Sequence, residues 1–117
     1  NRPGRGETDH QTVNICGGIT IFRKESIMRI GGWCEEFIGW GAEDDFQTIK
    51  VENFLTHYEQ KSRCYHLYHD REAPDMKWYQ RNLQLLQKYK SISKEDIAKS
   101  INNSLKKIGM KNTYDNF

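Results

Sequence analysis

The sequence predicts a mixed α/β domain. Two alternating or apolar runs, at residues 13–22 and 62–69, are typical of strands. Four other segments combine helical spacing of apolar residues with capping signals. The predicted order is strand, helix, loop, helix, strand, helix, helix. At 117 residues and 36% hydrophobic content, the chain suits one domain with a modest core.

The first half begins with a polar stretch containing two glycines and a proline, so we expect a flexible lead-in over residues 1–12. The strand at 13–22 is interrupted at Gly17 and Gly18. A short helix over 23–30 then ends at the Gly31–Gly32 pair. A loop rich in glycine and tryptophan follows. The next helix is expected to run from about Ala42 or Glu43 to about residue 57. One face of this helix should carry Phe46, Ile49, Lys50, Asn53 and Phe54.

The second half begins with the strand at 62–69. Asp75 follows a proline and is expected to cap a helix that runs to about Tyr89. Ser93 and Asp96 form a capping box at the start of a last helix. Its apolar stripe is Ile97, Ile101, Leu105 and Ile108, and Gly109 stops it. We therefore divide the chain into the lead-in, a half-domain over 13–73 and a helical hairpin over 74–117.

The overall charge gives little support to a nucleic-acid partner, because 18 basic and 16 acidic residues leave a net charge of only +2. The basic residues of 88–111 suit either a solvated face or contact with a membrane or a lipid-linked oligosaccharide. Three widely spaced cysteines show no disulfide framework, which favours reduced thiols and a cytoplasmic location, with the inner face of the membrane as a further option. No apolar run approaches the roughly 20 residues of a membrane span. The opening "NRPGRGETDH" resembles the interior of a longer protein, so we expect a fragment.

Three consecutive acids, Glu43, Asp44 and Asp45, fall at the predicted start of a helix. The helix dipole tolerates acids there by about 0.3–1 kcal/mol each, so a charged first turn without function is one explanation. It does not explain a third, repelling acid, or the preceding "GWGA". Glycines permit close approach of a ligand, and the flat face of Trp40 suits a sugar ring. Successive helical residues point about 100° apart, so Glu43 and Asp44 can address different hydroxyls of one sugar.

The stretch "GGITIFRKESIMRIGGWCEEFIGWGAEDDF" resembles the C-terminal half of the catalytic domain in the β-1,4-galactosyltransferase family and related bacterial family 2 glycosyltransferases. Those enzymes carry a Gly-Gly before a strand, a short helix, an "NGF"-like turn and then "GWGxEDD". Here Trp33 stands where phenylalanine is usual. The resemblance covers roughly residues 14–70. It implies an incomplete part of a glycosyltransferase A-type fold, the nucleotide-diphospho-sugar transferase fold, followed by the helical pair.

The resemblance also implies roles for individual residues. The aromatic matching Trp40 lies over the sugar, the acid matching Glu43 binds the acceptor, and the acid matching Asp44 is the general base. Asp45 is supporting, and Gly18 and Gly41 belong to the substrate-binding set. The implied reaction is inverting transfer of a hexose, of the galactose or N-acetylgalactosamine type, from a UDP-sugar to a glycan or lipid-linked acceptor in polysaccharide biosynthesis. Glucose and glucuronic acid also fit as donors, and related enzymes that retain configuration keep the stereochemistry open.

The resemblance further implies that His69 ligates Mn²⁺, or Mg²⁺, together with an Asp-x-Asp carboxylate and the nucleotide diphosphate. His66 is a second candidate on the metal side. Residues three apart in a strand point to opposite faces, so a joint site needs the strand to end between these histidines. No Asp-x-Asp follows a hydrophobic strand in this sequence, so we expect that half of the donor site to lie upstream of Asn1. The chain alone should bind nucleotide sugars weakly or not at all.

Two other classes of protein compete with the enzyme. A zinc-stabilised module would use Cys34, Cys64, His66 and His69, although no Cys-x-x-Cys pair is present. A non-catalytic interaction domain would present an aromatic contact surface. That surface would consist of Trp33, Trp78, Tyr79 and Tyr89.

Overall fold

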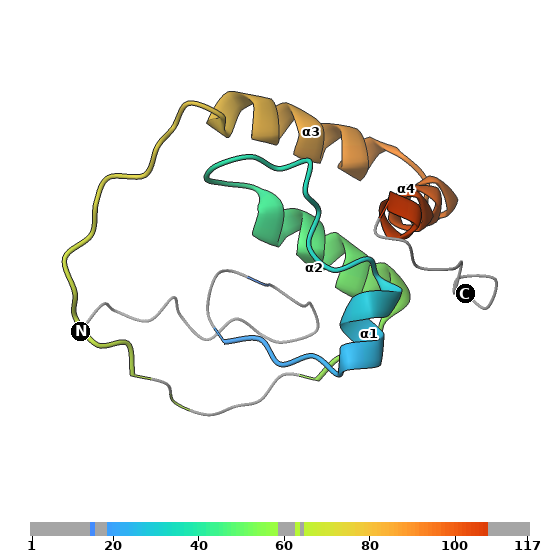
Figure 1. The fold of residues 1–117 in the computed structure, drawn as a ribbon, viewed down its shortest axis with the longest axis horizontal. Coiled ribbons are helices and arrows are strands. Elements are labelled where there is room, and N and C mark those ends of the chain that lie inside the picture. Colours follow the sequence, from blue (N-terminus) through green and yellow to red (C-terminus); the bar gives the residue numbers. More distant parts are fainter. Residues whose placement is uncertain (1–14, 16–18, 59–62, 64, 108–117) are drawn as a thin grey trace.

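The computed structural model describes residue 15, residues 19–58, residue 63 and residues 65–107. Four helices are present in this part of the chain: α1 (Lys24–Arg29), α2 (Glu43–Phe54), α3 (Tyr79–Ser91) and α4 (Lys94–Lys107). Figure 1 shows α1, α2 and α4 gathered on one side, with α3 above the loop that leads into α2. None of these helices is long and apolar enough to cross a bilayer.

Helix α1 ends at the glycine pair, as predicted. The Gly32 amide donates to the carbonyl of Ile27 at 2.8 Å, and the Gly31 amide donates to that of Met28 at 3.0 Å. These two bonds form a Schellman motif, which requires a left-handed residue after the helix. Gly31 provides it, with φ of +74°.

Helix α2 begins at Glu43, so the three acids lie in its first turn as predicted, and it ends three residues earlier than expected. Phe46, Lys50 and Phe54 are buried as one face, but Gln47 and Val51 are buried too. At about 100° per residue these five positions form one broad face of α2, which packs against the hydrophobic cluster.

Lys50 joins α2 to the end of α1. Its ammonium donates to the carbonyls of Ile30, at 3.2 Å, and of Gly32, and lies 5.3 Å from the centre of the Phe46 ring. Burial lowers the pKa of Lys50 to about 8. The charge is therefore costly where it sits, and the two carbonyls offset part of that cost.

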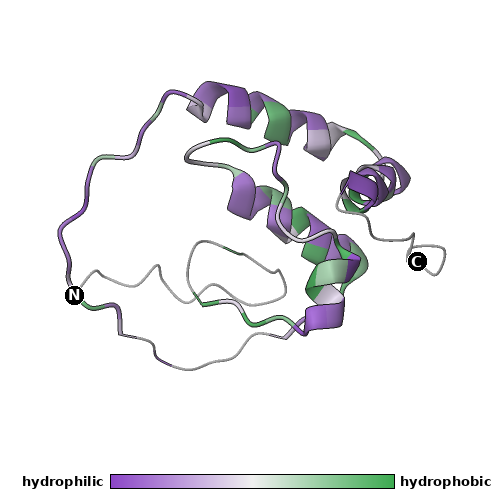
Figure 2. Ribbon diagram, viewed as in Figure 1, coloured by the Kyte–Doolittle hydropathy of each residue, from purple (hydrophilic) through white to green (hydrophobic). Residues whose placement is uncertain are grey.

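Helices α3 and α4 form the predicted helical pair. The expected cap at Asp75 is wrong: its carboxylate accepts from the Lys77 amide at 3.0 Å and closes a turn, and α3 begins only at Tyr79. The cap at Ser93 is confirmed, because its hydroxyl accepts from the Asp96 amide at 3.1 Å. Figure 2 shows that hydrophilic residues cover most of both helices.

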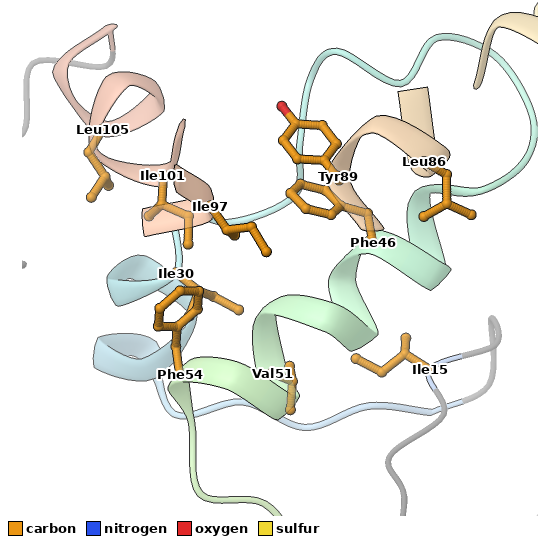
Figure 3. Packing of buried hydrophobic residues seen from close by; sticks show 10 residues of the cluster. All are labelled: Ile15, Ile30, Phe46, Val51, Phe54, Leu86, Tyr89, Ile97, Ile101 and Leu105. Carbon is orange, nitrogen blue, oxygen red and sulfur yellow. The ribbon is translucent and has the colours of Figure 1, made fainter. Parts of the chain in front are cut away.

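A single hydrophobic cluster connects all four helices (Figure 3). The rings of Phe46 and Tyr89 stack with centroids 4.0 Å apart, and Phe37 lies against both. Burying a side chain of this size contributes about 1.5–3 kcal/mol. The buried hydrophobic members are Ile15, Ile30, Phe46, Val51, Phe54, Leu86, Tyr89, Ile97, Ile101 and Leu105.

The described residues contain no strand, so the two predicted strands are not seen there. Most of 13–18 lies outside the described residues, as do the lead-in, Ile108 and Gly109. The described parts of 55–78 form an exposed connection without helix (Figure 1). The four helices of the described part neither support nor contradict a glycosyltransferase A-type fold. That fold and the domain boundaries both stay predictions.

Candidate functional site

The loop before α2 makes a tight turn that glycine permits. Gly39 and Gly41 have φ of +68° and +105°, and Ala42 follows with φ of +73°. A left-handed Ala42 is unusual for a residue with a Cβ, and it is the N-cap of α2 without any side-chain capping bond. The tight turn therefore places the start of α2, with its acids, only three residues after Trp40.

The first two acids differ in their surroundings. Glu43 is half-buried, and its Oε2 atom is buried without a hydrogen-bond partner. Burial, and then the neighbouring charges of Glu43 and Asp45, raise the pKa of the Asp44 carboxyl. Asp45 is exposed. A raised pKa makes Asp44 a stronger proton acceptor, and the half-buried Glu43 lies next to it in the same helical turn.

Trp40 precedes these acids by three to five residues, and about half of its surface is exposed (48%). Its ring centre lies 5.4 Å from that of Tyr79, and the two planes are tilted by 35°. Tyr79 comes from α3. The exposed Trp40 ring therefore packs beside α3, three residues before Glu43, and its place over a sugar stays a prediction.

The histidines lie in the exposed connection. The ring centroids of His66 and His69 are 5.1 Å apart, and Nδ1 of His69 is 2.9 Å from the carbonyl oxygen of Asp70. Because no strand forms here, the two rings can lie close together despite their spacing. Within the described residues, no group of three or more histidine, cysteine or acidic side chains could hold a metal ion. Two imidazoles do not make a complete site, so oxygen ligands from elsewhere would be needed.

Cys34, one of the residues of the zinc-stabilised module, is half-buried against the hydrophobic cluster, and burial is the main cause that raises the pKa of its thiol. Among the described residues it belongs to no group of three or more side chains that could hold a metal ion. Cys64, like Gly18, lies outside the described residues. In the aromatic contact surface of the interaction-domain hypothesis, Tyr89 is buried in the core and is not available.

Two polar residues near the site were not predicted. Gln47, one turn beyond Glu43, is 1% exposed, and neither of its amide atoms has a hydrogen-bond partner. Asn82 of α3 is completely buried and bonds to the loop before the acids. One signal in the sequence could have identified Asn82: it continues the spacing of Leu86 and Tyr89 on the buried face of α3, where a polar residue needs a partner.

Acids on a helix start beside an exposed tryptophan define a candidate carbohydrate-active site. A family model described as the N-terminal domain of galactosyltransferase matches residues 7–70, more than half of the chain. The chain belongs to this galactosyltransferase family and is a glycosyltransferase-type domain. The match does not support the expected placement in a C-terminal half. No curated protein and no solved structure gives a significant match.

Proposed function

We propose that this domain binds the acceptor and supplies the general base in the transfer of a hexose from a nucleotide sugar. The family match supports glycosyl transfer at a coarse level. The observation that carries the finer proposal is the first turn of α2, where Glu43 and Asp44 are both half-buried and the pKa of the Asp44 carboxyl is raised. Both lie within four residues of the accessible Trp40 ring.

The proposed reaction is a single displacement. Trp40 packs against the C–H face of the acceptor sugar, and Glu43 accepts a hydrogen bond from one hydroxyl. Asp44 takes the proton of the reacting hydroxyl as its oxygen forms a bond to the anomeric carbon of the donor. The bond to the nucleotide diphosphate breaks, and the diphosphate leaves with the electron pair. Attack from the face opposite the leaving group inverts the anomeric configuration.

For the donor, the described residues supply only the two histidines of the exposed connection. UDP-galactose or UDP-N-acetylgalactosamine is the proposed donor, and a glycan or lipid-linked oligosaccharide is the proposed acceptor. Mn²⁺ would neutralise the diphosphate, with His69, and His66 as a second candidate, offering imidazole to it. The remaining ligands would be oxygens outside the described residues. A peripheral position at the inner face of a membrane belongs to the same proposal.

The test is the Asp44→Asn substitution in the intact enzyme that contains this chain. We expect turnover to fall by at least about 10²-fold, with acceptor binding little changed, because a general base contributes on that scale. The matched control is Glu52→Gln, which removes one exposed carboxylate from the same helix. Asp44→Asn should not lower the melting temperature, since the ionised Asp44 is disfavoured by burial and its acidic neighbours. Turnover near the wild-type level would refute the assignment of the base.

A further inference from the structure

The loop that carries Trp40 is held by helix α3. Asn82 is completely buried, and its Nδ2 atom donates to the carbonyls of Ile38 at 2.9 Å and Trp40 at 3.3 Å. Its Oδ1 atom accepts from the Ile38 amide at 3.4 Å. Both donor hydrogens and the acceptor of the side chain are therefore directed at one loop, 44 residues away in sequence.

This arrangement has a physical reason. The loop has no strand or helix to pair its peptide groups, and unpaired buried peptide groups cost free energy. Asparagine is a weak helix former, and a buried amide without partners is costly. Its place on the buried face of α3 is explained by the bonds that it makes to Ile38 and Trp40.

Two neighbouring side chains at the start of α3, its N-cap Trp78 and its first residue Tyr79, hold the same loop by contact. A Cβ on Gly39 would lie 3.0 Å from Cδ1 of Trp78, and a Cβ on Gly41 would lie 2.7 Å from Cδ2 of Tyr79. Each glycine thus lets a ring of α3 approach the backbone on either side of Trp40. Figure 1 shows the loop running alongside α3 before it turns into α2.

We infer that Asn82 is a positioning residue for acceptor recognition: it fixes the backbone of Trp40, and with it the position of the ring relative to the acids of α2. The inference rests on the proposed function. It extends the site to α3, which lies beyond the residues 7–70 matched by the family model. Since Trp40 precedes Glu43 by only three residues, a shift of the loop changes the spacing between the aromatic surface and the carboxylates.

The experiment follows the indole N–H resonance of Trp40 by nuclear magnetic resonance in the full chain, assigned with Trp40→Phe. The variants are Asn82→Leu, which removes every bond to the loop, and Asn82→Ser, which leaves room for water if the leucine variant does not fold. The control is Asn53→Ser, because the side chain of Asn53 donates to the Ile49 carbonyl within its own helix. Glucose and N-acetylglucosamine are the probes.

The Trp40 resonance is measured without sugar and with sugar, and the two measurements distinguish failure of the positioning role from failure of the proposed function. Without sugar, the Asn82 variants should move the Trp40 resonance and the control should not; an unmoved resonance overturns the inference. With sugar, the wild type should titrate, and the Asn82 variants should need roughly tenfold more sugar, equivalent to about 1.4 kcal/mol of binding free energy, because the spacing between Trp40 and the carboxylates is no longer fixed. Equal titration by wild type and variants overturns the positioning role alone. A wild-type resonance that neither sugar moves overturns the proposed function, and the acceptor role of Asn82 with it.

Discussion

Replacing Gly41 with alanine tests whether the loop before α2 is packed against α3 as described. Gly41 has φ of +105°, and an added Cβ would lie 2.7 Å and 2.9 Å from two ring carbons of Tyr79. A side chain in this backbone region costs about 1–3 kcal/mol. Overpacking against the ring adds about 1–3 kcal/mol. We therefore expect Gly41→Ala to lower the free energy of unfolding by about 2–6 kcal/mol.

Gly32 provides a matched control. It also has a positive φ, of +63°, but an added Cβ would meet nothing within 4 Å. Gly32→Ala should therefore lower the free energy of unfolding only by the strain of a left-handed backbone, about 1–2 kcal/mol. Urea denaturation followed by circular dichroism measures both, and an unchanged denaturant slope shows that the unfolded state is not altered.

A double variant separates strain from overlap. In Gly41→Ala combined with Tyr79→Ala, the overlap disappears and only the strain of the backbone remains, so the two substitutions should be strongly non-additive. If Gly41→Ala lowers the free energy of unfolding no more than Gly32→Ala does, the Tyr79 ring does not lie against Gly41. Additive effects of the two substitutions would contradict the same contact.

Two further predictions concern the core and the donor. Because the pKa of Lys50 is lowered to about 8, the unfolded chain holds a proton above that pH that the folded chain has lost, and stability should rise from about pH 8 toward pH 10. The free energy of unfolding of the wild type, minus that of Lys50→Met, should increase by up to about 3 kcal/mol over that range. The exposed control Lys90→Met should have the same dependence of unfolding free energy on pH as the wild type. If the difference between the wild type and Lys50→Met does not change with pH, Lys50 is solvated. Calorimetry with UDP-galactose and Mn²⁺ should show weak or no binding to this chain alone, and micromolar binding would prove that expectation wrong.

Local signals in the sequence predicted the helices well. The glycine pair after α1, the Ser93 cap of α4 and the acidic start of α2 each act through neighbouring peptide groups, so a short stretch of sequence is sufficient to identify them. Asp75 shows the limit of such signals. The same carboxylate can cap a helix or an isolated turn, and the structure has the turn.

Long-range features could not be predicted in the same way. Alternation of apolar residues indicates which face of a strand is buried, but not which segment pairs with it. Ile19 and Ile21, in the first predicted strand, are exposed in the structure. Trp40 and the acids could be grouped from the sequence because they are only three to five residues apart, whereas Asn82 and Tyr79 reach the loop only through the packing of α3.

The stacking of Phe46 on Tyr89 also limits how far α2, with the three acids of its first turn, can rotate about its own axis. A carboxylate on an α-helix lies about 5–6 Å from the helix axis, so a rotation of α2 by about 10° would carry it sideways by about 1 Å. Displacement by 1 Å can cost about 10²-fold in rate. Phe46 follows Asp44 by two residues on the same rigid helix. In the proposed reaction, the packing of Phe46 on Tyr89 in the hydrophobic core would therefore limit how far the Asp44 carboxylate can move from the reacting hydroxyl.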